Sequence, residues 1–113
     1  MADAREQRMV PQHLNIPTEQ IEAFCRRWKI AELSLFGSVL REDFRPDSDV
    51  DVLVTFSSDA DWSLSERVRM EGELTEILGR RSDLVERRVI ERSENYIRRR
   101  HILSTAEPVY VAR

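Results

Sequence analysis

The residues best suited to chemistry are a Gly-Ser pair and two acids that follow it closely. Gly37-Ser38 is separated by ten residues from Asp49-Val-Asp51, which opens a β-branched run with high strand propensity. Because side chains alternate along a strand, Asp49 and Asp51 are predicted to point to one face. Two converging carboxylates repel one another unless a cation lies between them, and hard oxygen ligands favour Mg²⁺ or Mn²⁺. The spacing indicates a metal site, and the alternative is a solvated strand edge that carries aspartates.

The Gly-Ser pair itself indicates a phosphate site. It follows the apolar run from Leu33 to Phe36 and precedes a segment that could wind as one or two helical turns. This order predicts a strand, a tight turn and a helix start, because glycine adopts backbone torsions that a Cβ forbids. The free N–H groups that open a helix point to an anion. Gly37 and Ser38 are therefore predicted to hold a phosphate.

The same stretch resembles the signature of a known superfamily. Phe36-Gly-Ser38 through Arg45-Pro-Asp-Ser-Asp-Val-Asp51 is similar to the motif of nucleotidyltransferases of the DNA polymerase β type. More narrowly, it resembles the minimal nucleotidyltransferases, the antitoxin-like MNT proteins. The likeness is specific over residues 33–56 and looser elsewhere. It implies that the Gly-Ser turn binds the triphosphate of ATP and that the two acids bind the catalytic metal ions.

One position in this stretch departs from the family pattern. Many relatives carry Arg-Gly after the turn, where this sequence has Arg41-Glu42. Arg41 is predicted to lie one turn into the short helix. It either reaches a phosphate of the nucleotide or pairs with acids on the surface nearby.

A third acid completes the predicted site. Ser82 to Ile90 is predicted to be a strand from its β-branched content, and a place beside the second strand would bring Asp83 onto the face of the first two acids. The family's third carboxylate lies in the same Asp-Leu-Val context, so the resemblance implies that Asp83 is the third catalytic and metal-binding residue. Three such acids would hold two Mg²⁺ ions about 3.5–4 Å apart, which activate an attacking hydroxyl and neutralise the leaving pyrophosphate.

Two alternatives remain open for this third strand. Glu86 is the alternative ligand, because a register slip of one residue exchanges the two faces of a strand. The other alternative is that Asp83 is a surface acid, paired with Arg80 or Arg81.

The remaining elements are predicted to support this site. A helix begins near Thr18, its predicted N-cap, and a second helix runs from Trp62 to Leu78 and ends at Gly79. A third helix is expected over 91–105, packed on the sheet, and a short final strand over 108–111. The first helix is predicted to bury Ile21, Phe24, Cys25 and Trp28. The second is predicted to bury Leu64, Val68, Leu74, Ile77 and Leu78, with Met70 at the border and Trp62 as a core anchor.

Composition narrows the class of protein. The chain has 113 residues, of which 41% are apolar and 35% charged, as in a small globular domain with a highly charged surface. A net charge of −3 gives no general attraction to nucleic acid, so we expect no direct nucleic-acid binding, and we interpret Arg98-Arg-Arg-His101 as a solvated helix face. The lone Cys25 suits a reducing compartment, and no segment has the apolar length of a membrane span. We therefore expect a cytoplasmic protein without membrane association.

These observations predict an α/β domain with the polymerase β-like nucleotidyltransferase fold. Its small mixed sheet of three to four strands is flanked by helices, over residues 16–113, and residues 1–15 are expected to be a flexible arm. A domain of this size leaves no room for a second domain that grips an acceptor, so a bound partner must present the hydroxyl. The resemblance implies a HEPN-type toxin whose tyrosine receives AMP from ATP.

Two other functions compete with this enzyme. One is a catalytically weak antitoxin that neutralises its partner by binding alone. The other is a regulatory nucleotide-binding module. Three clustered acids favour the enzyme, because binding alone has no need of them.

Overall fold

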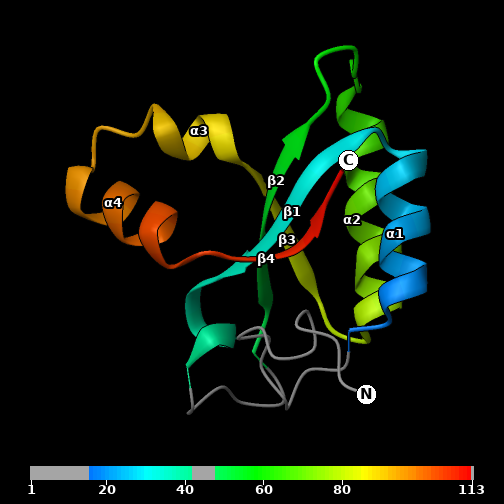
Figure 1. Ribbon diagram of the computed structural model, residues 1–113, viewed down its shortest axis with the longest axis horizontal. Helices are drawn as coiled ribbons and strands as arrows, with labels where there is room; N and C mark the ends of the chain where they lie inside the picture. The colour runs from blue at the N-terminus through cyan, green and yellow to red at the C-terminus, as the bar shows by residue number, and fades with distance from the viewer. Residues whose placement is uncertain (1–15, 42–47, 113) are drawn as a thin grey trace.

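A four-stranded mixed sheet forms the centre of the chain, which the computed structural model describes over residues 16–41 and 48–112. β1 (Ile30–Phe36) pairs antiparallel with both β2 (Val50–Phe56) and β4 (Glu107–Val111), whereas β3 (Ser82–Glu86) runs parallel to β2. The predicted mixed sheet flanked by helices is confirmed (Figure 1). The strand order across the sheet is β3-β2-β1-β4.

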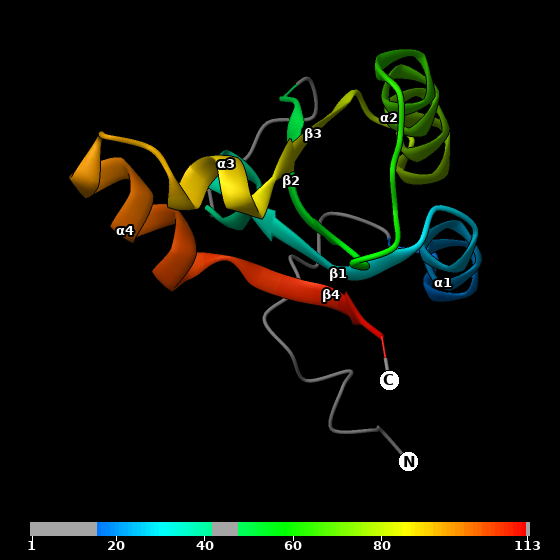
Figure 2. The same cartoon turned by 90° about the horizontal axis from the view of Figure 1, so that it is seen from above.

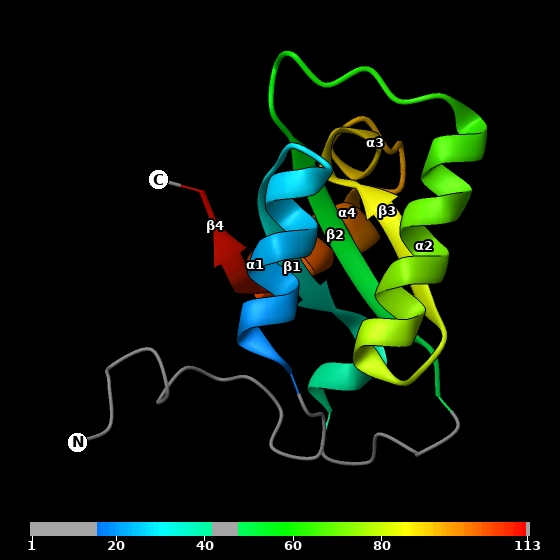
Figure 3. The ribbon, with the colours of Figure 1, turned by 90° about the vertical axis from the view of Figure 1, so that its right-hand side faces the viewer.

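The two faces of the sheet carry different helical layers. α1 (Thr18–Arg27) and α2 (Leu64–Leu78) lie side by side on one face (Figure 3). The short α3 (Arg87–Glu91) and α4 (Tyr96–Thr105) lie on the other face (Figure 2). The function of the acidic side chains of the sheet therefore depends on which of these two faces they share.

Alternation along β2 decides which surface that is. Val50, Val52 and Val54 are buried in the core formed with α1 and α2. Leu53 instead belongs to a smaller apolar cluster with Phe36 of β1 and residues of α3 and α4. Because successive side chains point to opposite faces, Asp51 shares the α3–α4 face with Leu53.

α1 buries the predicted stripe but begins one residue from the predicted cap. Ile21, Phe24, Cys25 and Trp28 are all buried. The prediction that Thr18 is the N-cap is wrong, because Pro17 occupies that position and no side chain caps the helix. Proline fixes its own φ and lacks an N–H, so it can precede a helix without help from a capping side chain.

α2 is bounded by clear signals at both ends. Ser63 is the N-cap and forms a capping box with Glu66, and Gly79 ends the helix with φ +72°, as predicted. Trp62 lies just outside the helix, where its indole N–H donates to the Trp28 carbonyl oxygen at 2.9 Å. Its ring meets that of Trp28 edge-on at 5.1 Å between centroids, so the predicted core-anchoring role is confirmed.

The predicted apolar stripe of α2 is wrong in its first half. Leu64 is 79% exposed and Val68 63%, whereas Met70, expected at the border, is fully buried. The buried line of the helix runs through Met70, Leu74 and Leu78, spaced four residues apart. Val68 lies about a third of a turn away from Leu74 around the axis, so it faces solvent.

The segment after Ser82 also differs from its prediction. The third strand ends at Glu86, and Arg87–Glu91 forms the short α3. Ile90 of α3 packs with Phe36 and Ile102, so a tertiary contact overrides the strand propensity of the segment.

The last helix is shorter than predicted, and the last strand is confirmed. α4 begins only at Tyr96, after Asn95, whose side-chain oxygen accepts from the Arg98 N–H at 3.1 Å. Of its apolar side chains only Ile102 is buried. Tyr96 and Ile97 are exposed, so the prediction that they pack on the sheet is wrong. β4 forms at Glu107–Val111 and pairs with β1, as expected.

Some predictions concern residues that are not described. They are the arm over 1–15, the pairing of Arg41 with Glu42 or its neighbours, and the turn at Pro46 and Asp47. In the described part of the chain, no helix has the length and apolarity needed to cross a membrane.

Candidate active site

Pairing of β1 with β2 brings the two halves of the motif together. Phe36, the last residue of β1, is the register partner of Asp51 in β2. Gly37 follows at once with φ +78°, a left-handed conformation that favours glycine. A Cβ on Gly37 would lie 2.5 Å from the Asp51 Oδ2, closer than side chains pack. Glycine is therefore required here for two reasons, its backbone torsion and the close approach of the Asp51 carboxylate.

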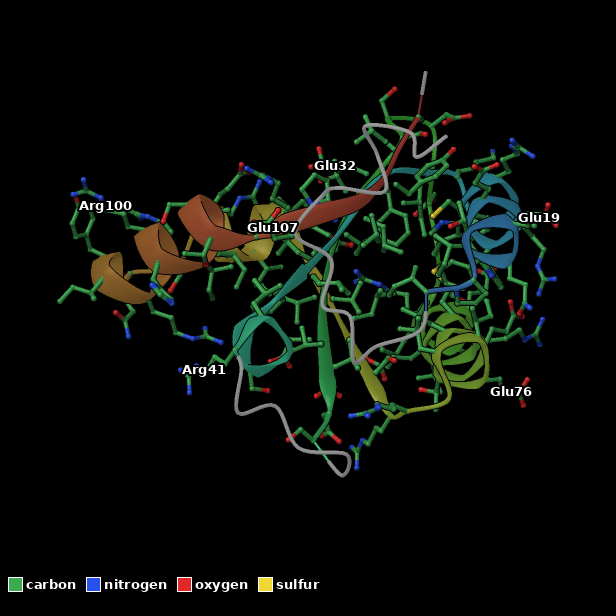
Figure 4. The ribbon with its side chains drawn as sticks, turned by 60° about the horizontal axis from the view of Figure 1, so that its bottom comes forward. Glu19, Glu32, Arg41, Glu76, Arg100 and Glu107 are labelled. Carbon is green, nitrogen blue, oxygen red and sulfur yellow. The ribbon has the colours of Figure 1, made fainter. Side chains whose placement is uncertain are left out.

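The turn after Gly37 is a single 3₁₀ turn, η2 (Gly37–Leu40). Val39 is fully buried and fixes the turn to the core, while Ser38 is half-buried. The Arg41 N–H donates to the Ser38 carbonyl oxygen at 3.0 Å and ends the turn. Arg41 itself is exposed and lies on the same side of the sheet as α4 (Figure 4). The predicted glycine turn followed by a short helical segment is thus present.

The parallel pairing of β2 with β3 places the third acid. Asp83 is the register partner of Asp51, so the two side chains share one face of the sheet. α2 holds β3 at the sheet edge, because its Thr75 Oγ1 and Glu71 Oε2 accept the N–H groups of Ser82 and Leu84 at 3.1 and 2.8 Å. The predicted neighbourhood of Asp51 and Asp83 is therefore present.

Glu86 is on the opposite face and cannot replace Asp83. Its side chain is 8% exposed and is paired with Arg67 of α2 and with Arg88. The alternative in which Glu86 is the third ligand is therefore wrong, because the register of β3 directs Glu86 towards α2.

Asp49 lies just before β2, within ion-pair distance of Arg81. Its side chain is 46% exposed, and the Asp49 Oδ2 lies 4.0 Å from the Arg81 Nε. Among the described residues, no three acidic, histidine or cysteine side chains are gathered closely enough to hold one metal ion. An exposed ion pair stabilises a protein by at most about 1 kcal/mol, so the contact with Arg81 would oppose a movement of Asp49 towards a cation only weakly.

The electrostatics of Asp51 show that the charges of the other two acids act on it. Burial raises the pKa of Asp51 above its ordinary value, and the charges of Asp83 and Asp49 raise it further. The positive charge of Arg98 opposes that rise. A carboxylate held among like charges and partly out of water is stabilised by a cation, so the donor set suits a divalent ion.

Arg98 is a residue near the site that sequence reasoning missed. It is exposed, as expected of a solvated helix face, yet its charge acts on Asp51 because α4 lies on the same face of the sheet. The sequence separates the two residues by almost half the chain, and no motif links them. Only the packing of α4 could have shown this neighbourhood.

The acids lie away from a cavity at the other end of β2. That cavity has a volume of about 250 Å³, and Phe56, Trp62 and Glu86 are among the residues that line it. Asp49 lies just before β2 and Asp51 is its second residue, so we assign the cavity no part in the chemistry.

Comparison with known proteins agrees with this geometry. Residues 18–105 match the model of the nucleotidyltransferase domain family. A protein adenylyltransferase MntA of Thermococcus cleftensis is 41% identical over 71 residues, which are 63% of this chain and 70% of the relative. A solved structure described as a minimal nucleotidyltransferase is 31% identical, with a TM-score of 0.60 over 79% of this chain and 85% of the other.

A more distant structure shares the fold. It is a chain from the complex of a tri-AMPylated HEPN toxin of Shewanella oneidensis with an MNT antitoxin. The TM-score is 0.55 at 20% identity, over 84% of this chain and 70% of the other, which shows a likeness of fold alone. Because the family model covers most of the sequence, the chain belongs to the nucleotidyltransferase domain family, as the Gly-Ser and Asp-Val-Asp spacing predicted.

Proposed function

We propose that this chain transfers AMP from ATP to a tyrosine hydroxyl of a HEPN-type toxin and thereby acts as its antitoxin. The observation that carries the proposal is the position of Asp51. Its carboxylate lies against Gly37 of the predicted phosphate turn and is in register with Asp83. The adenylyltransferase relative and the AMPylated toxin complex support the choice of nucleotide and acceptor.

Divalent metal ions are generally used by the family. We propose that Asp49, Asp51 and Asp83 hold two Mg²⁺ ions, for which Mn²⁺ can substitute, because carboxylate oxygens suit these hard cations. When bound, such ions neutralise the charge of the triphosphate and make the attacking hydroxyl easier to deprotonate. To bind a metal ion, the Asp49 carboxylate exchanges its contact with Arg81 for the ion.

The residues of the chain then have separate tasks. The backbone of Gly37 and Ser38 holds the triphosphate, and Asp51 stands between this turn and Asp83. The reaction forms a bond from the tyrosine oxygen to the α-phosphorus and breaks the bond from that phosphorus to the oxygen that bridges to the β-phosphate. Pyrophosphate leaves, and the tyrosine proton passes to solvent. The main contribution of the protein is to align these atoms.

The place of the reaction follows from its substrate. ATP is available in the cytoplasm, and the lone Cys25 remains reduced there. We therefore propose a cytoplasmic protein.

Intact-mass measurement of a HEPN-type partner tests the proposed function. We expect one or more AMP-sized increments after incubation of the partner with the chain, ATP and Mg²⁺. The increments should disappear with Asp51→Asn and with a chelator. The matched control is Asp59→Asn, which removes an exposed acid of the β2–α2 loop that lies outside the site.

The same experiment separates the competing functions. A partner that stays unmodified but is fully inactivated would show an antitoxin that acts by binding alone. A partner that is neither modified nor inactivated, while ATP binds to the chain, would show a regulatory nucleotide-binding module. Either outcome would contradict the proposed transfer.

A further inference from the structure

The first turn of α4 exposes two large apolar side chains beside a run of cations. Tyr96 is 56% exposed and Ile97 is 80% exposed. Arg99 and Arg100 follow in the same helix, and α4 contains no acidic residue. We call Tyr96, Ile97, Arg99 and Arg100 the α4 patch. A surface that combines exposed apolar groups with arginines has the composition found at the centre of protein interfaces.

Tyr96 is held in place although it is exposed. The Arg99 guanidinium lies 5.4 Å from the centre of the Tyr96 ring, and its Nη1 donates to the Ser93 carbonyl oxygen at 2.9 Å. From the other side, the Arg100 Nη1 donates to the Tyr96 hydroxyl at 3.2 Å. Arg100 extends from α4 at the edge of the molecule (Figure 4). A side chain that is already ordered loses less entropy on binding, so Tyr96 is a suitable anchor for a partner.

The helix that carries the α4 patch lies on the face of the sheet that also carries Asp51 (Figure 2). Ile102 of α4 packs with Phe36 and Leu53, which lie on the same sheet face as Asp51. A protein that presents a hydroxyl at this site therefore approaches the sheet face on which α4 lies.

We propose that the α4 patch is the docking surface for the acceptor protein, and that the matching partner surface is apolar with an acidic rim. The inference rests on the proposed function, because only a transferase with a protein acceptor needs a docking surface beside its acids. Charge complementarity favours an acidic partner over nucleic acid, because the helix is basic but the whole chain carries a net charge of −3. The apolar surface of Ile97 would also have no counterpart on a phosphate backbone.

Two substitutions of matched exposure test the docking surface. Ile97→Asp places a charge in the α4 patch, and Leu64→Asp places one at a position 79% exposed on α2, on the other side of the sheet. Neither side chain is buried, so both variants should fold. With a HEPN-type toxin as the probe, we expect Ile97→Asp to weaken binding by at least about tenfold and Leu64→Asp to change it less than about twofold. The affinity for ATP should stay unchanged in both.

Kinetics give a second readout that a structural defect would not reproduce. With Ile97→Asp, the KM for the toxin should rise while kcat at saturating toxin is kept, because docking is weakened and the acids are untouched. Tyr96→Ala should act in the same direction, because it removes the ordered anchor of the patch. A fall in kcat with unchanged KM would contradict a docking role.

Other outcomes overturn the inference in distinct ways. Toxin affinity that is lost with Leu64→Asp but kept with Ile97→Asp would place the toxin on α2. A dimer of this chain that dissociates with Ile97→Asp, while toxin binding persists, would show that a second copy covers the patch. RNA binding that is lost with Ile97→Asp, without loss of toxin binding, would assign the patch to nucleic acid.

The inference can also be separated from the proposed function. Toxin binding that depends on Ile97 without any AMP increment would refute the transfer and keep the docking surface. AMP transfer with a wild-type KM in Ile97→Asp would refute the docking surface and keep the transfer.

Discussion

Gly37→Ala should impair the site more than it impairs the fold. The added Cβ would lie 2.5 Å from the Asp51 Oδ2, and ordinary contact begins near 3.4 Å, so the carboxylate must retreat by about 1 Å. A displacement of that size at a catalytic group lowers activity by roughly 100-fold. The left-handed backbone, φ +78°, adds a cost of about 1–2 kcal/mol for any residue with a Cβ.

A second glycine separates these two effects. Gly79 has nearly the same torsion, φ +72°, but nothing lies within 4 Å of a Cβ built on it. Gly79→Ala should therefore carry the backbone cost alone, which corresponds to a fall in Tm of roughly 4–8 °C for each kcal/mol, and should keep activity. Gly72→Ala is the control of opposite sign, because a helix-interior alanine with open space around it should stabilise the protein by about 0.5–1 kcal/mol.

Thermal melts and AMP transfer at a fixed toxin concentration make the measurement. We expect a fall in Tm for Gly79→Ala and a fall at least as large for Gly37→Ala, but a loss of transfer for Gly37→Ala alone. Wild-type transfer by a folded Gly37→Ala variant would refute the reasoning, because Asp51 would then not depend on the turn.

Four further predictions concern the site and the core. Asp51→Asn should abolish transfer yet raise the Tm at neutral pH without metal. The folded chain keeps the Asp51 proton to higher pH than the unfolded chain, so wild-type stability falls as pH rises from the ordinary pKa through the raised one, and melts of both proteins should coincide below this window. Arg81→Ala should tighten Mg²⁺ binding by freeing Asp49, and unchanged titration curves would exclude this competition. Ser38→Ala should weaken ATP binding less than Gly37→Val, because the backbone donors remain, and equal, negligible losses would exclude the phosphate turn. Cys25 should resist alkylation in the native protein, because burial raises the pKa of its thiol to about 12, and rapid labelling would contradict this.

Local sequence was enough to predict the candidate site. The Gly-Ser turn, the alternation of Asp49 and Asp51, and the strand that carries Asp83 all depend on backbone torsions and side-chain period over a few residues. Such rules act between close neighbours in the chain, so they could be applied before any fold was known. The first strand and the C-cap at Gly79 were predicted for the same reason.

Tertiary structure decided how these pieces meet. The register of β2 against β3 excluded Glu86, and the packing of Ile90 turned the predicted end of β3 into α3. The same packing brought α4, which carries Arg98, onto the sheet face of Asp51 and left Ile97 exposed. Each outcome depends on a contact between residues far apart in the chain, where propensity and period carry no information. The sequence alone therefore predicted which groups could form the site, and long-range packing determined which of them share a face of the sheet and which side chains remain exposed.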